Sequence, residues 1–160
     1  MYYRTISSPI GPLHLAADQQ GLRFLLFAQG RKAVAPAAEW VADHGELDEP
    51  VRQLDAYFRG ALREFTIEIA AEGTDFQKTV WAELRRIPFG ETVSYGELAT
   101  RIGNPKAVRA VGLANGSNPI AIVIPCHRVI GSTGSLVGYG GGLPTKQALL
   151  ALERGQARLL

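Results

Sequence analysis

The sequence predicts an α/β N-terminal half followed by a mainly helical C-terminal half that contains a helix-turn-helix. Short apolar segments with turn signals fill the first 27 residues, helix-capping signals recur after residue 73, and the charge divides near the same point. Residues 1–75 carry 7 Lys and Arg against 11 Asp and Glu, whereas residues 76–160 carry 10 against 4. We therefore expect an α/β domain over 1–73 and a basic domain over 74–160, and a basic surface favours a polyanionic partner.

Three strands are expected at the N-terminus. Each is a short run rich in aromatic, β-branched or leucine residues, a composition that favours extended backbone. Turns that contain Pro, Gly or Gln separate the runs. The expected strands are Tyr2–Ile6, Leu13–Ala17 and Leu22–Phe27.

A helix and a fourth strand are expected in the rest of this half. Pro50 suits the first turn of a helix, and the apolar stripe that follows it includes Leu54 and Tyr57. Residues 31–45 show little periodicity and are expected to form a loop with at most a short helix. Apolar and polar residues alternate over 65–69, which predicts a strand.

The C-terminal half carries repeated helix-start signals. Thr74 and Gln77 have the spacing of a capping box, and the helix that they open is expected to end at Pro88. Ser94 opens a short second helix in the same way. A last helix is expected over residues 144–154, with a proline at its start and a glycine after its end.

A helix-turn-helix is expected between residues 94 and 116. Gly103 stops the helix that Ser94 opens, and Asn104 as N-cap with Pro105 at the first helical position starts the next. Two helices joined by a tight link have the outline of a motif whose second member contacts DNA. Two helices that only pack on a core look the same, so both interpretations stay open.

The chain's single cysteine lies in the most informative stretch. Cys126 follows Pro125, which interrupts an apolar strand-like run over 120–124, and precedes His127 and Arg128. Both cations are expected to favour the thiolate. Because neighbouring side chains of a strand point to opposite faces, direct contact between Cys126 and His127 requires a local bend. A reactive nucleophile and a small buried apolar residue are both compatible with this pattern.

The composition excludes several classes of protein. One cysteine permits no internal disulfide and no thiolate-rich zinc site, so we expect neither a metal nor a cofactor. No apolar run approaches the roughly 18 to 20 residues that span a bilayer, and the N-terminus lacks a signal-peptide pattern. We expect a cytoplasmic protein without membrane contact.

Four blocks of the sequence resemble the O6-alkylguanine-DNA alkyltransferases, also called methylated-DNA–protein-cysteine methyltransferases, of the bacterial single-chain type. They occur in the family's order and cover most of residues 74–155, and residues 8–13 and 57–58 resemble the family weakly. The blocks are Pro88–Tyr95, Asn104–Gly112, Pro125–Val129 and Gly138–Gly142. The resemblance implies a ribonuclease-H-like N-terminal domain and stoichiometric, single-turnover transfer of an alkyl group from guanine O6 to Cys126. It implies no cofactor.

The resemblance also implies roles for particular side chains. Cys126 would be the nucleophile, linked through water to His127 and on to Glu153. Tyr95 would push the damaged nucleotide out of the duplex and hydrogen-bond the base. Asn118 would tie the turn of the recognition motif to the active-site strand.

The implied partner is double-stranded DNA that carries O6-alkylguanine, bound through its minor groove with the base flipped out. Arg109 would fill the vacated space in the duplex. The other implied DNA contacts are Ser94, Tyr95, Asn104, Ala110 and Gly112. The implied guanine pocket is formed by Val129, Tyr139, Gly140 and Gly141. A monomer in solution is implied, and cooperative binding along DNA stays open.

The sequence lacks two features of some relatives, and two rival functions stay open. It lacks the cysteines of the N-terminal zinc site and the extra cysteine-rich domain of the transcription-activating fusion proteins. A cysteine hydrolase that uses Cys126 and His127 would turn over many times on an ester or a peptide. A non-catalytic DNA-binding module would keep its function without the Cys126 thiol.

Overall fold

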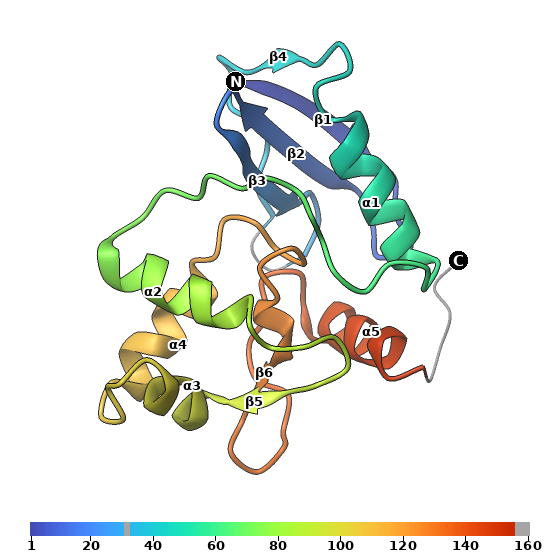
Figure 1. Ribbon diagram of the computed structural model, residues 1–160. Coiled ribbons are helices and arrows are strands. Elements are labelled where there is room, and N and C mark those ends of the chain that lie inside the picture. The colour runs from blue at the N-terminus through green and yellow to red at the C-terminus, as the bar shows by residue number, and fades with distance from the viewer. Residues whose placement is uncertain (31–32, 156–160) are drawn as a thin grey trace.

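The N-terminal strands form a four-stranded sheet in the computed structural model, which describes residues 1–30 and 33–155 (Figure 1). The strands are β1 (Tyr2–Ile6), β2 (Leu13–Asp18), β3 (Gly21–Phe27) and β4 (Val41–Ala42). Their order is β3-β2-β1-β4, with β4 parallel to β1 and the other pairs antiparallel. The three strands expected from the sequence are confirmed to within one residue at each end.

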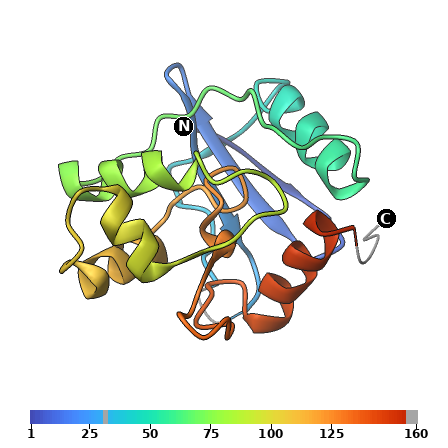
Figure 2. The same cartoon turned by 60° about the horizontal axis from the view of Figure 1, so that its bottom comes forward.

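Helix α1 (Asp48–Phe58) lies alongside this sheet (Figures 1 and 2). It begins two residues before Pro50, close to the expected start. Its inner face buries Leu54, Tyr57 and Phe58 in the core. The sheet and this helix make the N-terminal half an α/β unit.

The prediction of a regular strand over residues 65–69 is wrong. Ile69 makes only an isolated parallel bridge with Leu22 of β3. Before that bridge, the side chain of Gln53 supplies the hydrogen bonds. Its Oε1 accepts from the Thr66 N–H at 3.0 Å, and its Nε2 donates to the Thr66 hydroxyl at 2.9 Å. The apolar alternation therefore reflects an extended linker with one buried face, and no ladder forms along most of it.

The C-terminal half is mainly helical, with a short parallel pair of strands beside the helices (Figure 1). Its helices are α2 (Asp75–Leu84), α3 (Tyr95–Arg101), α4 (Val108–Gly116) and α5 (Leu143–Glu153), with a 3-10 turn, η1, at Cys126–Arg128. Its strands are β5 (Val93–Ser94) and β6 (Val129–Ile130). An α/β half followed by a helical half is the arrangement that the sequence predicts.

Two of the predicted helix caps are present. Thr74 Oγ1 accepts from the Gln77 N–H at 3.1 Å, and Gln77 Oε1 accepts from the Thr74 N–H at 2.9 Å. Ser94 Oγ caps α3 by accepting a backbone N–H of its first turn at 3.1 Å. The expected end of the first helix at Pro88 is wrong, because α2 ends at Leu84. Two tight turns follow the helix, in which the Arg86 N–H donates to the Glu83 carbonyl and the Ile87 N–H donates to the Leu84 carbonyl, each at 3.0 Å. A proline restricts only the residue directly before it, so the sequence pattern did not locate these turns.

The predicted start of α4 at Asn104 and Pro105 is also wrong. The Asn104 carbonyl accepts from the Ala107 N–H at 3.0 Å, which closes a four-residue turn. The helix starts after that turn, at Val108. A proline fixes one backbone angle that suits both the second position of such a turn and the first turn of a helix, so the sequence pattern did not distinguish them.

The two halves share one core where β3 meets the segment before the cysteine. Leu25 donates to the Pro119 carbonyl at 2.9 Å, and the Ala121 N–H donates to the Leu25 carbonyl at 3.1 Å. The strand expected over 120–124 stops there, because Ile122 adopts a positive φ of 73° and the chain turns. The result is a buried turn that the N-terminal sheet supports directly.

None of the helices among the described residues is long and apolar enough to cross a membrane.

Candidate active site

Cys126 opens the 3-10 turn η1 and is 7% exposed. The Asn118 side chain bridges the preceding turn: its Oδ1 accepts from the Ile120 N–H at 2.9 Å, and its Nδ2 donates to the Ile124 carbonyl at 2.7 Å. These bonds fix the direction in which the chain enters η1. The 3-10 turn η1 supplies the local bend after Pro125 that a direct contact between Cys126 and His127 would require.

The surroundings of the thiol differ from the expectation. Burial raises the pKa of the Cys126 thiol, against the lowering effects of Asn118, Lys146 and Tyr139. His127 and Arg128 do not contribute, because both side chains point to a carboxylate on the other side of η1. Neither neighbour therefore acts on the thiol as the directly adjacent cation that the sequence had suggested. Adjacent residues on a tight turn face different partners.

That carboxylate belongs to Glu153 at the end of α5, and it is the centre of a group that we call the rear cluster. Its Oε2 lies 2.7 Å from His127 Nε2, and its two oxygens accept from Arg128 Nε at 2.7 Å and Nη2 at 3.0 Å. Arg128 also donates to the Ile87 carbonyl at 2.7 Å. The rear cluster consists of Tyr57, His127, Arg128 and Glu153.

The charges in the rear cluster fix the proton positions. Burial would raise the pKa of Glu153, but hydrogen bonds and charge from His127 and Arg128 hold it well below its usual range. The carboxylate is thus ionised and can only accept, so Nε2 of His127 carries the hydrogen. Burial lowers the pKa of His127 despite Glu153, so the ring is neutral near pH 7 and its Nδ1 bears a lone pair. This Nδ1 is buried and has no hydrogen-bond partner in the described part of the chain.

Lys146 is a site residue that the sequence analysis missed. It is fully buried in α5, and its Nζ donates to the Val129 carbonyl at 2.6 Å and the Val137 carbonyl at 2.9 Å. It therefore ties the strand after the cysteine to the glycine-rich loop. A signal was present: Lys146 and Glu153 are seven residues apart, on the same helical face as Leu149. Charged residues on an apolar stripe must find buried partners.

An open cavity of about 340 Å³ has a wall whose residues interact with Cys126, although Cys126 itself does not line it. Three wall residues interact with Cys126. Asn115 Nδ2 lies 3.5 Å from the Cys126 carbonyl oxygen, and the charge of a Cys126 thiolate adds to burial, the larger effect, in raising the pKa values of Tyr95 and Tyr139. Asn115 Oδ1 and Tyr139 Oη are buried and have no hydrogen-bond partner among the described residues. The open cavity is lined by Tyr95, Gly112, Asn115, Gly116, Val137, Gly138, Tyr139 and Gly140.

The four residues expected to form a pocket are divided by the structure. Tyr139 and Gly140 line the open cavity. Val129 is fully buried in β6, and its carbonyl faces Lys146 rather than the cavity. Gly141 packs on the Phe27 ring so closely that an added Cβ would lie 3.0 Å from the ring carbons. Asn115, which sequence reasoning missed, takes part in the wall instead.

The residues expected to contact DNA lie on α3, α4 and the turn between them. Arg109 and Ala110 are exposed on α4, and Asn104 is exposed in the turn. Half-buried Tyr95 begins α3 next to the capping Ser94. Gly112 faces the Tyr95 ring, which lies 3.8 Å from the position of an added Cβ. These residues thus connect an exposed helical surface with the open cavity.

Comparisons with known proteins match nearly the whole chain. Residues 1–71 match the family model of the 6-O-methylguanine DNA methyltransferase ribonuclease-like domain, and residues 75–155 match that of its DNA binding domain. The chain belongs to this methyltransferase family. The methyltransferase is 54% identical over 153 residues to the methylated-DNA–protein-cysteine methyltransferase of Methanosarcina acetivorans, covering 96% of this chain and 98% of the relative.

Solved structures of the family have the same fold. A crystal structure of Mycobacterium tuberculosis OGT in complex with DNA is 54% identical, with a TM-score of 0.91. The alignment covers 98% of this methyltransferase and 95% of that chain. A second crystal structure, of the M. tuberculosis O6-methylguanine methyltransferase, gives a TM-score of 0.89 at the same identity.

Proposed function

We infer that this protein repairs DNA by moving an alkyl group from O6 of guanine directly to Cys126. One observation carries the inference: the only cysteine of a chain in this family precedes the histidine of a hydrogen-bonded carboxylate–imidazole pair and interacts with three wall residues of a cavity. Among the described residues, two of those wall residues have buried polar atoms without a hydrogen-bond partner. A relative that is 54% identical has been crystallised in complex with DNA, which supports DNA as the partner, and we propose that this DNA is double-stranded.

The sulfur attacks the alkyl carbon, and the bond from that carbon to O6 breaks. The electron pair stays on guanine, which takes up one proton, and the thiol gives one proton to the relay, so the reaction neither releases nor consumes a proton overall. Because the thioether is chemically inert, each molecule acts once. Full ionisation of a free thiol would raise the rate at pH 7.5 only about tenfold. Alignment of sulfur and carbon contributes more, on the order of 7 kcal/mol in favourable cases.

The rear cluster removes the thiol proton. In the proposed relay one water molecule bridges Cys126 Sγ and His127 Nδ1, the nitrogen with the lone pair. Glu153 holds the ring through Nε2 and stabilises the imidazolium that forms during transfer. Since burial opposes ionisation of the free thiol, the proton leaves as the alkyl group arrives.

The open cavity receives the base, and α3 and α4 bind the DNA as a helix-turn-helix. Tyr95 supports the rotated nucleotide, and Arg109 occupies the space that it leaves in the duplex. Flipping costs a few kcal/mol and is easier for a lesion that pairs badly. Ser94, Asn104, Ala110 and Gly112 complete the contacts, while Tyr139 and Gly140 bound the base with Val129 and Gly141 behind them.

The domain organisation is also part of this proposal. We place the boundary between residues 73 and 74, because the two family models match on either side of it. The N-terminal domain has a ribonuclease-H-like topology, and Asn118 ties α4 to the cysteine segment. The protein acts as a monomer in solution and binds DNA without a cofactor.

The decisive experiment is incubation with duplex DNA that contains O6-methylguanine, followed by intact-mass and peptide analysis. We expect one methyl group per molecule, located on Cys126, at a yield that equals but never exceeds the protein present. A Cys126→Ala variant is expected to bind the duplex and transfer nothing. Repeated turnover on an ester or peptide would instead support a cysteine hydrolase. Undiminished DNA binding by Cys126→Ala, with no methyl group transferred by either protein, would support a non-catalytic DNA-binding module.

A further inference from the structure

The rear cluster receives one of its hydrogen bonds from the N-terminal half. Tyr57 of α1 is fully buried, and its hydroxyl donates to Glu153 Oε2 at 2.6 Å, across 96 residues of sequence. The same oxygen accepts from His127 Nε2 at 2.7 Å and from Arg128 Nη2 at 3.0 Å. One carboxylate oxygen therefore divides its charge among three donors, one from α1 and two from η1.

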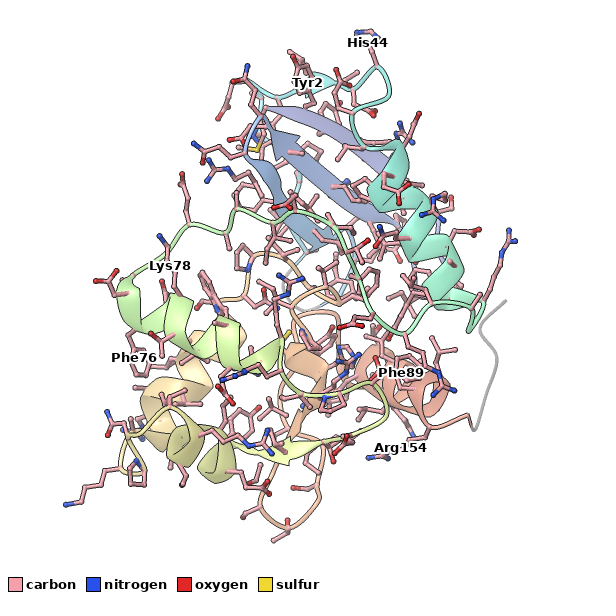
Figure 3. All side chains as sticks on the ribbon, in the orientation of Figure 1. Tyr2, His44, Phe76, Lys78, Phe89 and Arg154 are labelled. Atoms are coloured by element: carbon pink, nitrogen blue, oxygen red, sulfur yellow. The ribbon has the colours of Figure 1, made fainter. Side chains whose placement is uncertain are left out.

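Aromatic packing aims the Tyr57 hydroxyl. Its ring centroid lies 5.5 Å from that of Phe58, 5.3 Å from Phe65 and 6.2 Å from Phe89. Figure 3 shows Phe89 beside α5, the helix that ends in Glu153. Packing on several rings holds the Tyr57 ring in place without its oxygen. A change that removes only the oxygen therefore tests the hydrogen bond separately from the packing.

We propose that Tyr57 is a positioning residue for alkyl transfer and sets the proton affinity of His127 through the oxygen of Glu153 that they share. Tyr57 touches neither the sulfur nor the open cavity. Its hydrogen bond withdraws charge from Oε2, so less charge remains to stabilise a protonated His127 ring. The inference rests on the proposed relay, and it gives the N-terminal domain a direct part in the chemistry.

The other charged groups around His127 agree with this arrangement. Burial lowers the pKa of His127, Glu153 raises it, and the charges of Arg128 and Lys146 lower it further. Burial and the Glu153 charge raise the pKa of Tyr57 well above its ordinary value of 10.0. The hydroxyl therefore remains a donor through the pH range in which His127 titrates, and it exerts a constant effect on the ring.

A Tyr57→Phe variant should shift the pH dependence of methyl transfer. With one donor fewer on Oε2, His127 binds its proton more tightly, so the acidic limb of the single-turnover rate moves upward by about 0.5 to 1 pH unit. Imidazole NMR should show the same upward shift in the His127 pKa, with a His127→Gln variant assigning the signal. Tyr3→Phe is the matched control, because Tyr3 packs on Trp40 in the N-terminal half and should change neither reading.

A fluorinated tyrosine at position 57 gives the opposite test and preserves the native contacts. A more acidic hydroxyl donates more strongly to Glu153, so the pKa of His127 and the acidic limb should both move downward. This variant decides the question if Tyr57→Phe fails to fold. Unchanged His127 titration in both variants would overturn the role of Tyr57 while leaving the relay intact. An acidic limb that survives His127→Gln would overturn the relay itself, and the inference with it.

Discussion

The rear cluster and the wall of the open cavity differ in how many of their buried polar atoms have a hydrogen-bond partner. The rear cluster is fully buried and nearly saturated: both oxygens of Glu153 are paired, and among the described residues only His127 Nδ1 of this cluster lacks a partner. The wall of the open cavity, over the same described residues, keeps polar atoms of Asn115 and Tyr139 unpaired. Buried polar groups are costly when unpaired, which supports our proposal that this wall binds the base. The rear cluster thus fixes the positions of its side chains, whereas the wall of the open cavity has polar atoms that a ligand could bind.

The largest expected effect comes from removing the cation of the rear cluster. Arg128→Met should lower the free energy of unfolding by about 3 to 5 kcal/mol, because it leaves the buried Glu153 carboxylate without its counter-ion. Arg63→Met is the matched control. Arg63 lies 5.3 Å over the Phe89 ring, much as Arg128 does at 5.9 Å, but it is exposed. The control should lose less than about 1 kcal/mol.

Urea unfolding at pH 7 measures both variants. Equal losses would show that contact with Phe89, rather than the buried ion pair, stabilises this side of the cysteine. The rear cluster would then not be the part of the site that stabilises the fold, and its contrast with the open cavity would fail.

Arg109→Ala should have the next largest effect, confined to duplex DNA. Because the guanidinium is expected to fill the gap left by the flipped base, its loss should slow repair of duplex by about 10- to 100-fold. Attack on the free alkylated base should change little, and so should stability, since Arg109 is exposed. Single-turnover rates on the two substrates make the measurement. An equal loss on both would remove the gap-filling role.

Acid should weaken the rear cluster through His127. Burial lowers the folded-state pKa of His127 from its ordinary 6.5, so the unfolded chain binds the proton more readily. Its contribution is complete above pH 6.5 and is lost as the pH falls, at a slope of up to about 1.4 kcal/mol per pH unit. We expect the unfolding free energy to fall from pH 7 to pH 5.

Two variants separate the histidines in that measurement. Burial also lowers the pKa of His14, which bonds Thr5 at 2.7 Å in the N-terminal sheet. His127→Gln should flatten the pH dependence more than His14→Gln, because His127 is 0% exposed and His14 is 9% exposed. A wild-type slope in His127→Gln would mean that the rear cluster tolerates a protonated ring.

The sequence predicts much of this frame because its signals are local. The capping residues Thr74 and Ser94 bond backbone groups within one turn, so their spacing identifies α2 and α3 without tertiary information. The failures occur where distant groups decide. Gln53 of α1 takes over the backbone of Thr66, and the side chain of Asn118 bends a run of apolar residues whose composition is typical of a strand.

The family motifs predicted many of the residues that form the candidate site. Cys126, His127 and Glu153 were expected together, but the direction of each side chain was not. Arg128 faces Glu153 instead of the thiol because a tight turn sends neighbours to different partners. Tyr57 was expected as part of an apolar stripe and of a weak family match, but with no role in the site, since its hydroxyl bond spans 96 residues of sequence.

The smallest expected effect on stability tests the open side of the comparison. Tyr139→Phe removes a buried hydroxyl that has no hydrogen-bond partner among the described residues, so it should change the unfolding free energy by less than about 0.5 kcal/mol or stabilise the fold slightly. Its ring remains packed on Phe27 at 5.5 Å. Methyl transfer should nevertheless slow by about 3- to 10-fold, the value of one hydrogen bond to the sulfur or the base. A stable variant with an unchanged single-turnover rate would mean that the Tyr139 hydroxyl binds neither the sulfur nor the base. Only Asn115 would then remain as an unpaired polar residue in the described wall of the open cavity.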